Sequence, residues 1–226
     1  LAYTDSVLLE GLAGAPLISA GVSPVTTYNL LVLASIALSG WAMWRYALYL
    51  TGNSGAAILA GIVFAFVPYR FDHLHHLELQ ATIFLPLTLL YFERTLETGS
   101  RRNAALMMAS YVAEVFSCIY YSIFVATALV PIAAVRLWKM PADARRRIVV
   151  ATVPAVVVGL IVVAPYAYAY TLNRATLGDR LERDIQLYSA TLANYLAAPA
   201  ANLVHGAWSS PFGQSERFLF PGVLAI

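Results

Sequence analysis

Long apolar stretches alternate with short polar ones along most of this chain. A straight helix needs about 20 apolar residues to cross a bilayer, so this pattern predicts a series of membrane-spanning helices. Segments shorter than that must draw on their flanks or lie inside the helix bundle. The predicted spanning segments are residues 25–50, 55–67, 81–92 and 148–170, with two further helices inside residues 104–138. The fold class is therefore all-α, with six spanning helices and the start of a seventh at residues 218–226.

The stretches between these helices divide the rest of the chain. Residues 1–22 contain several glycines and a proline, so we expect a loop at the membrane surface. Ser23 and Pro24 are typical of a helix start, and Pro86 predicts a kink in its helix. Residues 1–170 form the predicted bundle, and residues 171–217 a polar, amphipathic segment. Because both ends look cut, we expect an internal piece of a longer polytopic protein.

The distribution of basic residues predicts the orientation, because Lys and Arg concentrate in short cytoplasmic loops. One set of alternating loops contains nine of them, whereas the opposite set contains only Arg70. This asymmetry requires residues 104–138 to turn back near Tyr120 and Tyr121. The histidine-rich loop 69–80, the loop 1–22, that turn and the segment 171–217 then all lie on the extracytoplasmic side. The nine basic residues are Arg45, Arg94, Arg101, Arg102, Arg136, Lys139, Arg145, Arg146 and Arg147.

Composition supports an integral membrane protein. Of the 226 residues, 60% are hydrophobic and only 12% are charged, against about 25% charged in an average soluble domain. The basic residues form no continuous stripe, so nucleic acid is not an expected partner. The single cysteine, Cys118, lies in an apolar run and excludes an internal disulfide framework.

The most unusual stretch is residues 69–80, called here the histidine segment. It contains three of the four histidines together with Arg70, Asp72 and Glu78. In a helix, residues three or four apart share a face, and imidazole with carboxylate can ligate a divalent cation or serve as acid and base. The alternative is a polar interfacial turn that hydrates two helix ends. Arg70 could pair with a phosphate, or its side chain could simply reach to the membrane surface.

Two further acids could contribute to a site on the outer face. Glu114 lies in a predicted spanning helix, where an ionisable group is costly and is a functional hypothesis by default. The alternative is a helix-to-helix hydrogen bond to Tyr111, Ser117 or a partner outside this piece of chain. Asp5 belongs to the first outer loop and would face the histidine segment, although a lone loop aspartate is usually just solvated.

These features resemble the C-type (GT-C) superfamily of polytopic membrane glycosyltransferases. The stretch Asp72–Gln80 is similar to the Asp-His-x-His-Phe-Gln motif of the glucosyltransferases that use dolichyl-phosphate-glucose. The resemblance implies transfer of a sugar from a polyprenyl-phosphate donor to a lipid or glycan acceptor, outside a bacterial inner membrane. It implies catalytic roles for Asp5, Asp72 and Glu114, substrate contacts from Arg70, His73, Tyr120 and Tyr121, and a divalent cation (Mg²⁺ or Mn²⁺) on His75, His76 and Glu78.

Two other functions fit the same residues. In a transporter or flippase, Glu114 and the outer histidines would relay protons through the bundle. Such a protein should carry charge near the bilayer midplane and often on both faces, whereas most polar groups here are expected outside. A catalytically inactive membrane scaffold would tolerate substitutions throughout the histidine segment.

Overall fold

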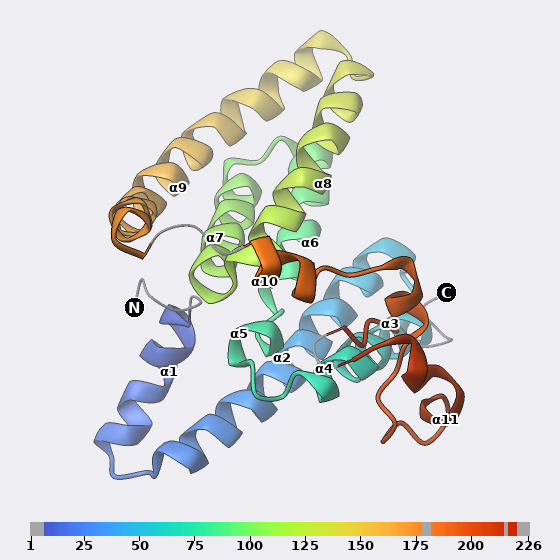
Figure 1. Cartoon of the computed structure of the whole chain (residues 1–226). Helices are drawn as coiled ribbons and strands as arrows, with labels where there is room; N and C mark the ends of the chain where they lie inside the picture. The colour runs from blue at the N-terminus through green and yellow to red at the C-terminus, as the bar shows by residue number, and fades with distance from the viewer. Residues whose placement is uncertain (1–6, 178–181, 215–216, 221–226) are drawn as a thin grey trace.

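The computed structural model describes residues 7–177, 182–214 and 217–220, and this part of the chain contains helices and no strand (Figure 1). Four helical stretches in it are long and apolar enough to cross a membrane. They are α2 (Pro24–Thr51), the stretch Ser54–Asp72 that comprises α3 (Ser54–Ala65) and α4 (Pro68–Asp72), α8 (Ile119–Trp138), and residues Ala142–Leu172 of α9 (Ala142–Leu177). The predicted all-α fold, with helices able to cross a membrane, is confirmed at this level.

The predicted count of six spanning helices and a seventh is not confirmed. Helices α6 (Phe84–Thr98) and α7 (Arg101–Ser117) have 15 and 17 residues. Both are shorter than the roughly 20 residues that a straight span needs. They pack side by side, and both also contact α8 and α9. Most of residues 218–226, the expected start of another span, lies outside the described residues.

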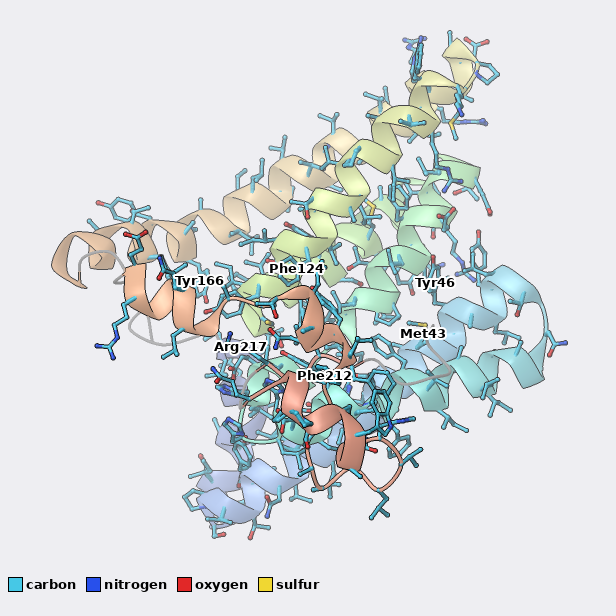
Figure 2. All side chains as sticks on the ribbon, turned by 45° about the vertical axis from the view of Figure 1, so that its right-hand side comes forward. Met43, Tyr46, Phe124, Tyr166, Phe212 and Arg217 are labelled. Carbon is cyan, nitrogen blue, oxygen red and sulfur yellow. The ribbon has the colours of Figure 1, made fainter. Side chains whose placement is uncertain are left out.

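The outer surfaces of the long helices are apolar. Phe124 on α8 and Leu160 and Ile161 on α9 are each more than three-fifths exposed. Figure 2 shows the side chains of α8 and α9 projecting outward, mostly as carbon. Surfaces of this kind favour lipid contact over water, because exposed apolar patches of such extent are rare on soluble monomers. The helices are therefore consistent with a bilayer environment.

The first described element corrects the sequence prediction. Residues Leu8–Ser19 form a helix, α1, rather than a loop, despite two glycines and Pro16. Packing explains the difference, because α1 contacts both α2 and α7. A Cβ added at Gly14 would lie 3.1 Å from the Thr27 side chain, so glycine allows α1 to approach α2 closely. Tertiary contact here outweighs poor helix propensity.

Helices α2 and α3 form an antiparallel hairpin with clear end signals. At the start of α2, the Ser23 hydroxyl accepts a hydrogen bond from the Thr26 amide (3.1 Å). At its end, Gly52 adopts the left-handed conformation (φ 63°), which glycine tolerates best. Asn53 then caps α3 through the Ala56 amide (3.0 Å). The helices touch at Gly61, where an added Cβ would come within 2.8 Å of the Gly40 carbonyl oxygen. The predicted start of α2 is confirmed.

Two further predictions about local structure have opposite outcomes. The long run 104–138 divides into two helices as expected: α7 ends at Ser117, Cys118 is extended, and α8 begins at Ile119. The predicted kink at Pro86 is wrong. Helix α6 begins at Phe84, so Pro86 occupies its first turn, where a missing amide proton costs nothing.

The C-terminal part contains short elements only. They are α10 (Glu182–Tyr188), the 3₁₀ helices η1 (Leu192–Leu196) and η2 (Ser210–Phe212), and α11 (Gly206–Ser209). Backbone hydrogen bonds from Leu219 to Asn194 (3.1 Å) and from Phe220 to Ala197 (3.0 Å) close this region on itself. Figure 1 draws it in orange to red. The predicted polar segment 171–217 differs at its start, because α9 continues to Leu177.

Candidate functional site

A groove lies where α1, the first turns of α2 and the histidine segment meet. Its volume is about 390 Å³. Apolar residues form much of its wall, and its polar lining consists of Glu10, Thr27, Tyr28, His75 and Glu78. Two carboxylates, an imidazole and a phenol thus share one concave surface beside membrane-spanning helices, which is typical of a ligand site. We call it the α1 groove.

The histidine segment is not one continuous helix. It consists of α4, a turn through residues 73–76, and the single-turn helix α5 (Leu77–Gln80). The turn gathers the imidazoles: the ring centroids of His75 and His76 are 4.2 Å apart, and that of His73 lies 4.1 Å from the Tyr69 ring. The Tyr28 hydroxyl donates to the Leu74 carbonyl (2.8 Å), which ties this turn to α2.

His76 and Glu78 form a pair at the groove. Nδ1 of His76 lies 3.0 Å from Oε1 of Glu78, within hydrogen-bonding distance. Glu78 is 7% exposed and lines the groove, whereas His75 lines it from an exposed position. A carboxylate that holds an imidazole in one orientation is a common device for acid–base chemistry. The contact between His76 and Glu78 joins two of the three residues that the sequence predicted as metal ligands.

Glu10 is the acid that α1 contributes. It is 6% exposed, and its Oε1 accepts a hydrogen bond from the Ser117 hydroxyl at the end of α7. Burial raises the pKa of Glu10, and the charge of Glu78 adds to this, while the Ser117 hydrogen bond opposes it. A buried carboxyl group with a raised pKa that also lines a groove is a candidate proton acceptor.

The acid predicted for the site from the first segment is Asp5, and Glu10 was missed. Asp5 lies outside the described residues. A helical reading of residues 8–19 would have found Glu10, because it is the one acid in an otherwise apolar stretch of that length. The glycines and Pro16 argued against a helix and concealed the signal.

Glu114 lies behind this site rather than in it. Its side chain is 1% exposed, and neither carboxyl oxygen has a hydrogen-bond partner within the described residues. It is near enough to Glu10 for their charges to repel. The alternative of a bond to Ser117 is not formed, because that hydroxyl donates to Glu10 instead. Glu114 does not line the α1 groove.

Other predicted site residues also lie away from the groove lining. His73 is buried, with Nδ1 2.9 Å from the Tyr69 carbonyl oxygen, and Asp72 lies 3.9 Å from the same Nδ1. Tyr121 interacts with Tyr69 through its side chain, and Tyr120 is exposed near the start of α8. The structure therefore places His75 and Glu78 at the groove, with His76 in contact with Glu78 but outside the groove lining.

The predicted divalent cation stays a prediction. Among the described residues, no group of three or more His, Cys, Asp or Glu side chains is arranged to hold a metal ion. His76 and Glu78 bind each other, and His75 does not converge with them on a common point. The donor set itself, two imidazoles and a carboxylate, suits a transition metal better than Mg²⁺.

Comparison with protein-family models, with curated proteins and with solved structures finds no match to this chain.

Proposed function

We propose that this chain carries the site of a membrane glycosyltransferase, which moves a sugar from a polyprenyl-phosphate donor to a lipid or glycan acceptor. The observation that carries the proposal is the α1 groove, where Glu10, His75 and Glu78 line one cavity beside apolar helices. A polyprenyl chain needs an apolar surface and its phosphate needs polar contacts. Such a groove meets both needs at one place. The resemblance of the histidine segment to GT-C enzymes supports the same function.

Glu10 is the proposed general base. Its carboxylate takes the proton of the acceptor hydroxyl as that oxygen forms a bond to the anomeric carbon of the sugar. The bond between this carbon and the phosphate oxygen breaks, and polyprenyl phosphate leaves with the electron pair. Each step uses a group that lines the groove, and the chemistry needs no redox change. Burial of Glu10 suits this role, because a raised pKa makes the carboxylate a stronger base.

The imidazole of His75 is the proposed phosphate contact. His75 donates from the exposed lip of the groove to a phosphate oxygen, where it stabilises the charge that builds up on the leaving group. Glu78 orients His76 through their 3.0 Å contact, and His76 itself does not line the groove. This assignment replaces the substrate role predicted for His73, whose Nδ1 is engaged with the Tyr69 carbonyl oxygen.

The proposed location is the extracytoplasmic side of a bacterial inner membrane. Basic side chains lie in the C-terminal parts of α6 and α8, near the end of α2, whereas the groove lies at the first turns of α2. Arg94 lies over the Tyr49 ring (5.0 Å), and Arg136 pairs with Glu93 (2.5 Å). Short basic segments favour the cytoplasm, which leaves the groove outside. In the finer topology, α6 and α7 would complete a six-helix bundle.

A transporter or flippase is the second candidate, and buried Glu114 favours it. An acid with no hydrogen-bond partner among the described residues is costly to bury in charged form and suits a group that binds and releases protons. The two functions differ in product. A transferase converts labelled polyprenyl-phosphate sugar into labelled acceptor, whereas a flippase moves the lipid across the bilayer unchanged.

The test is sugar transfer by the protein in bilayer nanodiscs, with radiolabelled polyprenyl-phosphate sugars and a mixture of lipid acceptors. Replacing His75 by alanine should lower transfer about 100-fold, because a phosphate contact made in the transition state is lost. His205→Ala is the matched control, since His205 packs against Trp208 and Phe220 away from the groove. Wild-type protein that transfers no sugar from any donor, or full activity of His75→Ala, would contradict the proposal.

A further inference from the structure

Arg70 is a buried cation, although the sequence suggested a phosphate ligand. Its side chain is 2% exposed, and it does not line the α1 groove. Within the described residues it takes part in no ion pair. Its guanidinium lies 5.6 Å from the centre of the Phe64 ring, and its terminal nitrogens bind neutral oxygens. Burying a cation without an acidic partner is costly, so these contacts must hold the group firmly.

The contacts of Arg70 close the histidine segment into a loop. Its Nη1 donates to the Gln80 carbonyl oxygen at 2.8 Å. In return, the Gln80 side-chain amide donates to the carbonyl oxygens of Arg70 (3.1 Å) and His73 (2.8 Å). Gln80 is itself fully buried. The two ends of an eleven-residue stretch, 70–80, are thus joined by reciprocal hydrogen bonds.

A second set of bonds fixes this closed loop to the bundle. Nη2 of Arg70 donates to the Thr82 hydroxyl, which donates in turn to the Ser39 hydroxyl of α2 (3.2 Å). Thr82 and Ser39 are both buried. Arg70 therefore links α4 to the turn before α6 and, through Thr82, to the middle of α2. His75, Leu77 and Glu78 of the closed loop line the α1 groove.

We propose that Arg70 is a positioning residue, which with Gln80 closes the histidine segment and thereby holds His75 and Glu78 in the α1 groove. The expected effect on sugar transfer rests on the proposed function. The expected effect on the stability of the segment rests on the hydrogen bonds alone. A lysine cannot replace the guanidinium, because one ammonium group cannot reach the Gln80 carbonyl and the Thr82 hydroxyl in the same fixed geometry. The role differs from a phosphate contact, which would require Arg70 to touch the donor.

The kinetic test compares Arg70→Lys, Gln80→Leu and the double variant in the transfer assay. Misplaced groove residues should lower kcat about 10- to 100-fold in each single variant and leave KM for the donor within about 2-fold. The double variant should be little worse than either single one, since all the bonds belong to one network. Arg45→Lys is the matched control, because Arg45 lies over the Trp41 ring farther along α2 (5.2 Å).

A structural readout separates this inference from the proposed function. The amides of His73, His76 and Leu79 hydrogen-bond within the segment. In Arg70→Lys and Gln80→Leu, their hydrogen exchange in nanodiscs should be at least about 10-fold faster than in wild type, with α2 unchanged. Wild-type exchange rates in both variants would contradict the positioning role of Arg70 and Gln80. A 10-fold higher KM for the donor in Arg70→Lys, with an unchanged KM in Gln80→Leu, would also contradict the positioning role. Absence of sugar transfer by the wild-type protein would count against the proposed function alone. The hydrogen-exchange rates would still test the positioning role of Arg70 and Gln80.

Discussion

Replacing Glu10 by glutamine is expected to lower sugar transfer about 1,000-fold. Glutamine keeps the size of the side chain and can still accept the Ser117 hydrogen bond through its carbonyl oxygen. It cannot take a proton from an acceptor hydroxyl. The measurement is initial transfer rate in nanodiscs at saturating donor, with KM determined separately. The loss should appear in kcat, because the base acts in the transition state rather than in binding.

The control for this variant is Glu97→Gln. Glu97 accepts a hydrogen bond from Tyr49 near the end of α6, remote from the groove, so its loss should leave transfer unchanged. The pH profile gives a second readout. Burial raises the pKa of Glu10 above 4.5, so its carboxylate is protonated at a higher pH than that of an ordinary glutamate. As the pH is lowered, wild-type activity should therefore begin to fall at this higher pH. Glu10→Gln with at least a tenth of wild-type activity would exclude Glu10 as the base.

Replacing Glu78 by glutamine is the second change with a large expected effect, a loss of about 100-fold. The carboxylate that orients His76 becomes a neutral amide, and the imidazole can then rotate or change tautomer. Glu78 also lines the groove, so the ligand loses a neighbouring charge. Transfer rate is measured against wild type, and near-normal thermal stability of the variant shows that the effect is local.

His76→Asn and the double variant complete a thermodynamic cycle for this pair. If Glu78 acts through His76, the double variant should lose about as much activity as the more impaired single variant. Fully additive losses would show that the two side chains act independently, and the 3.0 Å contact would then have no role in transfer.

The features predicted well from sequence are those set by local chemistry. Ser23-Pro24 begins α2, and the run 104–138 breaks at Cys118, because capping and length are properties of short stretches. The gathering of His75, His76 and Glu78 follows from their closeness in the chain. Their prediction did not depend on how the helices pack.

The features that were missed depend on contacts between distant segments. Glu10 belongs to the site because α1 folds back against α2 and α7, although its glycines disfavour a helix. Arg70 is buried because it donates hydrogen bonds to the Gln80 carbonyl oxygen and the Thr82 hydroxyl. No local sequence pattern predicts these two bonds. The predicted count of six spans stays unconfirmed, since α6 and α7 are shorter than a straight span needs.

The most direct test of the central claim is photolabelling of the α1 groove. The probe is a polyprenyl phosphate with a diazirine in its first isoprene unit, bound to the protein in nanodiscs. We expect the label on peptides from residues 7–31 and 73–79, in competition with unlabelled polyprenyl phosphate and weakened about 10-fold by His75→Ala. Label confined to α8 and α9, or label that His75→Ala leaves unchanged, would show that the groove does not bind the donor.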